Sequence, residues 1–189
     1  MNVRTLIEIE VKTNLKVKRL IYLVIVWSIF LVYLSILFKV VLFKYSHSQS
    51  FIIERIQTQL HWESIKIKIY YYSNLIPFRT IYNYVINNEN WRIGYINVVG
   101  NTILFIPFGL IISAMMYKSN SNRRIFSYAT LTSLSLEVIQ LILGLGQFDI
   151  DDLILNSIGA IIGIMLFNFV TIIYRSIFRK WIKEDLIVR

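Results

Sequence analysis

A glutamate inside an apolar segment is the residue of this sequence best suited to proton-transfer chemistry. Glu137 is the single charged residue between Ile125 and Phe148. Gln140 follows three positions later, on the same face of a helix. An ionisable side chain in such a segment is costly, so it usually faces other helices or a wet cavity. Glu137 is therefore either protonated and hydrogen-bonded or paired with a cation, and it is a candidate catalytic acid or base.

Two further groups of polar residues have the spacing of a helix face. Asn97 and Asn101 are four residues apart, and Asp149, Asp152 and Asn156 recur at intervals of three and four, whereas Asp151 points elsewhere. We expect the polar faces of the three helices to converge on one binding site. Two simpler interpretations stay open: interhelical hydrogen bonds of about 0.6 kcal/mol each, and solvated aspartates at a helix N-terminus, favoured by about 0.3–1 kcal/mol.

Composition places these polar residues in an integral membrane protein. The 189 residues are 56% apolar and 16% charged, whereas globular proteins are typically about 45–50% apolar and about 25% charged. The chain has no cysteine and two histidines, which excludes disulfides, thiolate metal sites and cysteine nucleophiles. The basic residues behind the net charge of +9 flank apolar segments instead of gathering on one folded face, so we predict no nucleic-acid partner. We also predict no cofactor.

Four apolar segments are long enough to cross a bilayer, which requires about 20 residues per helix. In lipid the backbone polar groups must be satisfied within the segment, so these segments are helices and not strands. The sequence predicts an all-α membrane protein, a four-transmembrane-helix bundle with a small extracytoplasmic cap between the first two helices. The expected membrane-spanning helices are residues 20–43, 93–117, 125–143 and 153–174.

The distribution of lysine and arginine predicts the orientation in the membrane. Thirteen of the 20 basic residues lie in segments 1–19, 118–124 and 175–189, whereas the connection 144–152 has none. The positive-inside rule then places both termini in the cytoplasm, the N-terminus as residues 1–19 and the tail as residues 175–189. The acidic loop 144–152 and the cap, residues 44–92, face outward. The tail also has the pattern of a helix lying in the membrane interface.

The cap combines two periodicities with an aromatic boundary. Helical spacing is seen in Ile52, Ile53, Ile56 and Leu60. The next apolar residues alternate with lysines in the period of a half-buried strand, at Ile65, Ile67 and Ile69. Residues typical of a headgroup boundary follow at Tyr70, Tyr71, Tyr72, Trp91 and Tyr95. We expect a small cap that lies on the membrane.

Proline and glycine positions indicate how the helices pack. Pro107 cannot donate to the carbonyl of Ile103 and should kink its helix, with Gly109 giving room. Gly159 and Gly163 form a small-xxx-small face that lets two helix backbones approach closely. These positions indicate architecture and not chemistry.

Taken together, these residues resemble the VanZ-like family of membrane proteins. The resemblance covers residues 74–163 and rests on four blocks in this order: Asn74–Ile81, Asn97 to Asn101–Gly109 with its FxPxG pattern, the ExxQ of Glu137–Gln140, and the DxxDxxxNxxG of Asp149–Gly159. Many relatives carry an arginine shortly before the first aspartate, which this sequence lacks. Arg79 and Arg92 are then the candidate counter-ions for Glu137 or Asp149.

The resemblance implies a role in the bacterial cell envelope, because the best-known family member is associated with glycopeptide (teicoplanin) resistance. The expected binding residues are Asn97, Asn101, Gln140, Asp149, Asp152, Asn156 and Arg79, with Glu137 as the candidate catalytic residue. The expected partners are membrane lipids and either a lipid-linked cell-wall precursor or a glycopeptide, with a homo-oligomer as a further option. The alternative is an intramembrane enzyme on lipid-linked precursors, with Glu137 as acid/base and Asp149 and Asp152 holding a divalent metal.

Overall fold

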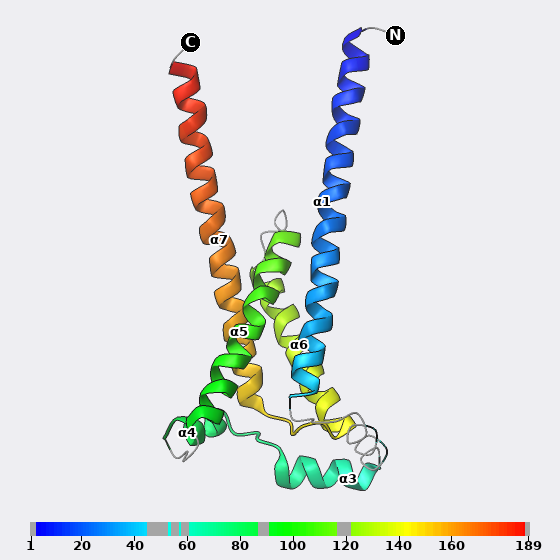
Figure 1. The fold of residues 1–189 in the computed structure, drawn as a ribbon, viewed down its shortest axis with the longest axis vertical. Coiled ribbons are helices and arrows are strands. Elements are labelled where there is room, and N and C mark those ends of the chain that lie inside the picture. The colour runs from blue at the N-terminus through cyan, green and yellow to red at the C-terminus, as the bar shows by residue number, and fades with distance from the viewer. Residues whose placement is uncertain are drawn as a thin grey trace.

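A computed structural model describes residues 3–44, 53, 57, 61–86, 91–116 and 122–187 of the chain (Figure 1). This part of the protein is helical and contains no strand, so the predicted all-α fold is confirmed. Its elements are α1 (Val3–Leu42), α3 (Trp62–Ile67), the π-helix η1 (Lys68–Tyr72), α4 (Arg79–Ile86), α5 (Trp91–Met115), α6 (Asn122–Leu143) and α7 (Ile150–Ile187).

Four of the described helices are long and apolar enough to cross a membrane, as the sequence predicts. The candidate spans are Lys12–Leu42, Gly94–Met115, Asn122–Leu143 and Ile150–Ile177. The first helix starts earlier than expected, and α7 runs from Ile150 through the tail to Ile187 without a break. Each backbone is hydrogen-bonded within its own helix, which is the condition for crossing hydrocarbon.

The helices are arranged with both termini at one end of the molecule (Figure 1). The long helices α1 and α7 diverge toward that end and extend beyond α5 and α6, which lie between them. At the opposite end the chain forms α3, η1, α4 and the loop between α6 and α7. We call residues 61–86 the cap segment. The cap segment lies beside the α6–α7 loop, at the end of the bundle opposite both termini.

Helices α5 and α7 pack backbone to backbone through glycines. A Cβ atom added to Gly159 would collide with the carbonyl oxygen of Thr102, and one added to Gly163 would collide with that of Ile106. From the other side, a Cβ on Gly109 would meet the carbonyl oxygen of Ala160. The close approach expected from the Gly159–Gly163 pattern is therefore present.

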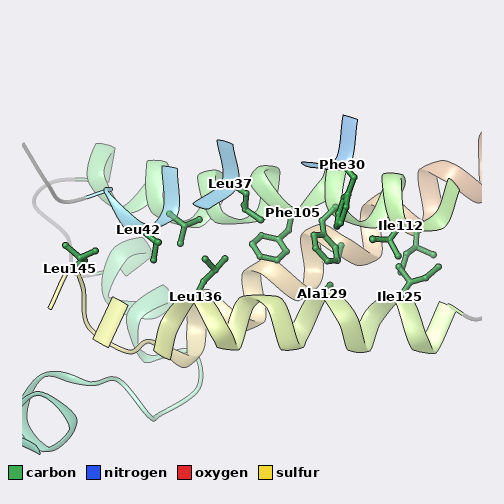
Figure 2. Close-up of a cluster of buried hydrophobic side chains, with 13 residues drawn as sticks. Phe30, Leu37, Leu42, Phe105, Ile112, Ile125, Ala129, Leu136 and Leu145 are labelled. Carbon is green, nitrogen blue, oxygen red and sulfur yellow. The ribbon is translucent and has the colours of Figure 1, made fainter. Parts of the chain in front are cut away.

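The buried side chains between the helices are mainly aromatic and branched aliphatic (Figure 2). Phe30 of α1 packs against Phe108 of α5 with ring centroids 5.9 Å apart, and Leu37, Phe105 and Leu136 belong to the same cluster. The hydroxyl of Tyr33 donates to the carbonyl oxygen of Leu104 at 2.7 Å. That carbonyl lies in the turn of α5 where Pro107 interrupts the regular backbone hydrogen bonds. This core packs α1, α5 and α6 against one another.

The cap segment differs from the predicted strand. Residues 62–72, which include Ile65, Ile67 and Ile69, form α3 and η1. A strand needs a neighbour to pair its backbone groups, whereas a helix satisfies them locally, and Glu63 also accepts from Lys66 at 3.2 Å. The strand prediction is therefore wrong. The helical pattern expected from Ile52, Ile56 and Leu60 lies outside the described residues.

Candidate functional site

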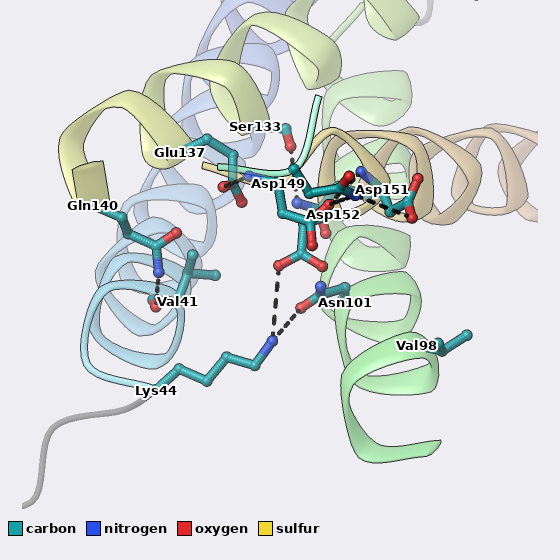
Figure 3. A network of polar contacts seen from close by, with 12 residues as sticks. Val41, Lys44, Val98, Asn101, Ser133, Glu137, Gln140, Asp149, Asp151 and Asp152 are labelled. Carbon is teal, nitrogen blue, oxygen red and sulfur yellow. Dashed lines mark hydrogen bonds and ion pairs between the residues drawn. The ribbon is translucent and has the colours of Figure 1, made fainter. Parts of the chain in front are cut away.

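A group of buried polar side chains lies where α5, α6 and α7 meet the cap segment (Figure 3). Although these side chains are polar, most are almost fully inaccessible, with Glu137 2% and Asp151 0% exposed. We call the group the polar cluster; it consists of Lys44, Asn101, Ser133, Glu137, Gln140, Asp149, Asp151, Asp152 and Asn156. Buried polar groups are costly unless they are paired, so the pairing inside the cluster determines what it can do.

The turn between α6 and α7 places the first acidic residue against Glu137. Gly144 ends α6 with a φ of 72°, a conformation that suits glycine at a helix C-terminus. The chain then returns, and the backbone N–H of Asp149 donates to Oε2 of Glu137 at 3.1 Å. Oδ1 of Asp149 accepts from the N–H of Asp151 at 2.8 Å, which caps the start of α7. Glu137 and Asp149, which belong to polar faces expected to converge, are thus joined by this hydrogen bond.

Asp151 joins α7 to the cap segment. Its carboxylate accepts hydrogen bonds from the backbone N–H groups of Phe78, Thr80 (2.7 Å) and Ile81 (3.1 Å), at the N-terminus of α4. These are donors that a helix cannot satisfy within itself. Asn74 adds a side-chain bridge, because its Nδ2 donates to Oδ1 of Asp149 at 2.9 Å. One buried carboxylate therefore caps a helix from another part of the chain.

The backbone strengthens this junction. The N–H of Asn74 donates to the carbonyl of Phe148 at 2.9 Å, and the N–H of Ile150 donates to the carbonyl of Asn74 at 3.0 Å. Phe78 has a φ of 67°, which is uncommon for a residue other than glycine. Asp151 accepts hydrogen bonds from the N–H groups of this same turn. The cap segment is therefore fixed to the start of α7 at several points.

Lys44 supplies the cation of the polar cluster. Its Nζ lies 3.9 Å from Oδ2 of Asp152 and donates to Oδ1 of Asn101 at 3.2 Å (Figure 3). The sequence interpretation named Arg79 and Arg92 for this role, and both side chains are exposed. The cation that reaches the acidic residues is thus Lys44, which follows α1 directly in the chain.

Two more hydrogen bonds connect the polar cluster to neighbouring helices. Nε2 of Gln140 donates to the carbonyl of Val41 at 2.8 Å, which ties α6 to the end of α1. Nδ2 of Asn156 donates to the hydroxyl of Ser133 at 2.8 Å, which ties α7 to α6. The predicted convergence of polar faces from three helices therefore holds in space, and α1 adds a fourth contributor.

One donor of the polar cluster is left over. Nδ2 of Asn101 is buried and has no hydrogen-bond partner among the described residues. Buried polar atoms are nearly always satisfied in folded proteins, so an orphaned donor is worth explaining. The Asn101 amide faces the carboxylate of Asp152, so an acceptor for this donor lies within the polar cluster itself.

A cavity of about 750 Å³ adjoins the polar cluster. Asn97, predicted as a site residue, lies in its wall, together with Gln140, Asp149 and Asp152. The cap segment contributes Tyr84, and burial together with the carboxylates of Asp152 and Asp149 raises the pKa of its phenol. Tyr84 is thus a protonated donor at neutral pH. The polar cluster is in this way connected to a volume that a small ligand could occupy.

Sequence reasoning missed Lys44, Asp151 and Tyr84. Lys44 looked like one of several basic residues beside a membrane helix, and nothing in its spacing indicated a partner 108 positions away at Asp152. Asp151 falls on a different face of α7 from Asp152, and helical spacing alone predicts that it points away from the site. The sequence feature that could have indicated Asp151 is the Asn74–Ile81 block. It lies outside the expected membrane spans, and the N–H groups at the start of its helix require acceptors from elsewhere in the chain.

The described residues contain no group of three or more His, Cys, Asp or Glu side chains placed to hold a metal ion. The acidic oxygens instead accept from backbone amides, Asn74 and Lys44. What the arrangement offers is hydrogen-bond donors and acceptors with one ion pair, which suits binding of a polar group.

A bundle of four membrane-spanning helices with a buried polar cluster at one end defines a multi-pass membrane protein built around a polar site. The chain belongs to the VanZ/LLP1 family, whose sequence model matches residues 30–173. Protein VanZ of Enterococcus faecium is 33% identical over 95 residues, which are 50% of this chain and 52% of that protein. The chain thus aligns with about half the length of this curated relative. No solved structure is significantly similar.

Proposed function

We propose that this protein acts in the bacterial cell envelope and lowers susceptibility to lipoglycopeptide antibiotics such as teicoplanin. The proposal extends the family membership, which covers residues 30–173, to the activity associated with that family. The observation that carries it is the buried polar cluster at the end of the bundle opposite both termini. With cytoplasmic termini, that end lies at the outer leaflet, where such antibiotics meet cell-wall precursors.

The charge pattern supports this placement. Basic residues are concentrated in segments 1–19, 118–124 and 175–189, which the positive-inside rule assigns to the cytoplasm. The opposite end carries exposed aromatic residues at Tyr70, Tyr71 and Tyr72, which suit a headgroup boundary. The cavity that adjoins the polar cluster, with Asn97, Asp149 and Asp152 in its wall, then lies near this boundary.

Burying the polar groups of the polar cluster costs free energy. Charged residues in membrane helices are rare and usually functional, because their desolvation is only partly repaid by pairing. A purely structural staple needs one hydrogen bond between two helices, whereas Glu137 of α6 and Asp152 of α7 bring two carboxyl groups to the same end of the bundle. These features favour ligand binding over simple stapling.

The alternative, an intramembrane enzyme with a divalent metal on Asp149 and Asp152, has less support. Asp149 accepts from Asn74 and from the N–H of Asp151, and Asp152 is paired with Lys44. These carboxylates already have partners, so the geometry favours a binding role.

The direct test is antibiotic susceptibility of a glycopeptide-sensitive Gram-positive host with and without the protein, measured for teicoplanin and vancomycin. Teicoplanin carries an acyl chain and vancomycin does not, so a site at the outer leaflet should affect teicoplanin more. We expect at least a several-fold rise in the inhibitory concentration of teicoplanin and a smaller rise for vancomycin. Equal shifts for the two drugs, or no shift for either, would contradict the proposal.

A further inference from the structure

We propose that the cavity under the cap segment binds the uncharged sugar headgroup of a membrane glycolipid. The cavity has a volume of about 750 Å³, within the range of about 300–1,000 Å³ found for small-molecule sites. It is bounded by α3, η1, α4, α5 and the turn between α6 and α7. The inference deepens the proposed function and rests on it for the placement of the cavity at the outer leaflet.

The wall of the cavity is rich in groups that both donate and accept hydrogen bonds. Side-chain amides come from Asn97, Gln140 and Gln147, with Nε2 of Gln140 already donating to Val41, whereas both ends of the Asn74 amide are bonded within the protein. Hydroxyl groups come from Ser64, Thr80, Tyr72 and Tyr84. An amide or a hydroxyl can donate to one ligand hydroxyl and accept from another, which is the pattern that a polyhydroxylated ring with an acetamido group requires.

The charges in the wall disfavour an ionic headgroup. An anionic phosphate would face the carboxylates of Asp149 and Asp152, which are opposed by Lys68 in the wall and Lys44 beside Asp152. A cationic headgroup would compete with partners that are already present, since Asp152 is paired with Lys44 and Asp149 accepts from Asn74. The formal charges of these two carboxylates and two lysines cancel, and a neutral ligand loses the least on entering the cavity.

Apolar side chains in the same wall match the other faces of a sugar ring. Ile67, Leu145 and Phe148 contribute hydrocarbon surface, and Tyr72 and Tyr84 contribute aromatic rings as well as hydroxyls. The C–H faces of a pyranose pack against such surfaces, while its hydroxyls reach the polar groups at the ring edge. A sugar ring can therefore contact both the amide-rich and the apolar parts of the cavity wall.

The surroundings of the cavity fit a lipid-linked sugar better than a free one. Exposed apolar residues lie on the elements that form its rim, including Ile67, Ile69, Leu75, Ile76 and Phe78. Exposed tyrosines follow on η1 at Tyr70, Tyr71 and Tyr72, where headgroup depth is expected. A sugar inside the cavity would leave its acyl chains beside these apolar side chains and in the lipid.

The test uses the full chain purified into phosphatidylcholine nanodiscs, with thermal unfolding as the readout. The probes are two neutral glycolipids, the β-glucoside and the β-N-acetylglucosaminide of dioleoylglycerol, and the controls are dioleoylglycerol and phosphatidylglycerol. A ligand that binds only the folded protein raises the unfolding temperature in a concentration-dependent way. We expect a saturable rise with at least one glycolipid and none with dioleoylglycerol. No rise with either glycolipid, or an equal or larger rise with phosphatidylglycerol, would overturn the inference.

Variants connect the effect to the cavity. Tyr84→Phe removes one hydroxyl and keeps the ring, and Asn97→Leu replaces an amide with an apolar side chain of similar size. Each should weaken glycolipid binding about tenfold, which is about 1.4 kcal/mol, because one ligand hydrogen bond in a buried site is lost. The matched control is Gly100→Ala on α5, since a Cβ there meets nothing within 4 Å. Glycolipid binding that survives both cavity variants at wild-type strength would place the ligand elsewhere and refute the assignment.

Failure of this inference and failure of the proposed function can be told apart. If the glycolipids bind and the teicoplanin response is absent in cells, the function is wrong and the cavity assignment stands. If teicoplanin susceptibility changes and neither glycolipid binds, the cavity assignment is wrong and the function stands.

Discussion

Asp151 shows how a fully buried carboxylate can be stable at the end of a membrane bundle. Its oxygens accept from three backbone N–H groups at the start of α4, and Nδ2 of Asn74 lies 3.5 Å from Oδ2. Hydrogen bonds to an ionised acceptor are shorter and roughly twice as strong as neutral ones. The carboxylate therefore replaces hydration by a set of fixed donors, and in return it fixes the cap segment to α7.

The first prediction concerns this carboxylate. Asp151→Asn keeps the shape but turns one acceptor oxygen into a donor that faces backbone N–H groups. We expect a loss of about 2–3 kcal/mol in the free energy of unfolding, since bonds to a charged group contribute about 1.5–3 kcal/mol. Thermal unfolding in nanodiscs measures this, with Ser135→Ala as control, because the hydroxyl of Ser135 is exposed and bonds only within α6. An Asp151→Asn variant as stable as the control would contradict the capping role.

The second prediction concerns the ion pair of Lys44 and Asp152. Lys44→Met leaves the carboxylate of Asp152 without its cation, whereas Lys44→Met combined with Asp152→Asn removes both charges. The double variant should therefore be more stable than the sum of the two single variants predicts, with a coupling energy of about 0.5–3 kcal/mol. Thermal unfolding of the four proteins gives this energy. Additive effects would mean that the 3.9 Å separation reflects proximity without interaction.

At the scale of the elements, the contact between α5 and α7 is set by glycines. The third prediction is that Gly159→Ala separates the two helices, because its Cβ would strike the carbonyl oxygen of Thr102 in the α5 backbone, which cannot give way. Overpacking of this kind costs about 1–3 kcal/mol.

Gly100→Ala is the matched comparison, on α5 and in open space. It should be neutral or slightly stabilising, because alanine is the better helix former. Membrane abundance and unfolding temperature of the two variants measure the difference. Equal stability of Gly159→Ala and Gly100→Ala would refute the close contact.

The helices could be predicted from the sequence, and the cap segment could not. Uncharged runs such as the one from Gly94 to Met115 have no other stable form in lipid, so composition is sufficient. Outside lipid, a short alternation of apolar and polar residues occurs both in strands and in helices, as it does here over Ile65, Ile67 and Ile69. The choice over residues 62–72 depended on whether a partner strand existed, which local spacing does not reveal.

The same division applies to the candidate site. The convergence of Glu137, Asn101 and Asp152 followed from helical spacing, because helix geometry fixes which residues share a face. The ion pair and the helix cap instead join segments that are far apart in the sequence. Lys44 pairs with Asp152, and Asp151 accepts from residues 78–81. Such contacts depend on how loops return, and no periodicity encodes them.

At the scale of the whole molecule, the proposal depends on which side of the membrane the cap segment faces. The fourth prediction is that Gln147→Cys, in the turn between α6 and α7, reacts with a membrane-impermeant thiol reagent on intact cells, whereas Ser176→Cys in α7 reacts only after permeabilisation. Both side chains are exposed, and the natural chain has no cysteine that would interfere. Labelling of Ser176→Cys alone on intact cells would reverse the orientation and move the polar cluster to the cytoplasmic side.

The central claim is that the polar cluster works as one functional unit at this end of the bundle. The most direct measurement is a double-mutant cycle of Glu137→Gln and Asp152→Asn, read as teicoplanin susceptibility at equal membrane abundance. Each change keeps shape and removes a titratable carboxyl, and residues that act as a unit are not additive. We predict that each single variant loses most of the protection and that the double variant loses no more. Single variants that protect like the natural protein at normal abundance would contradict the claim and leave the polar cluster as a structural feature.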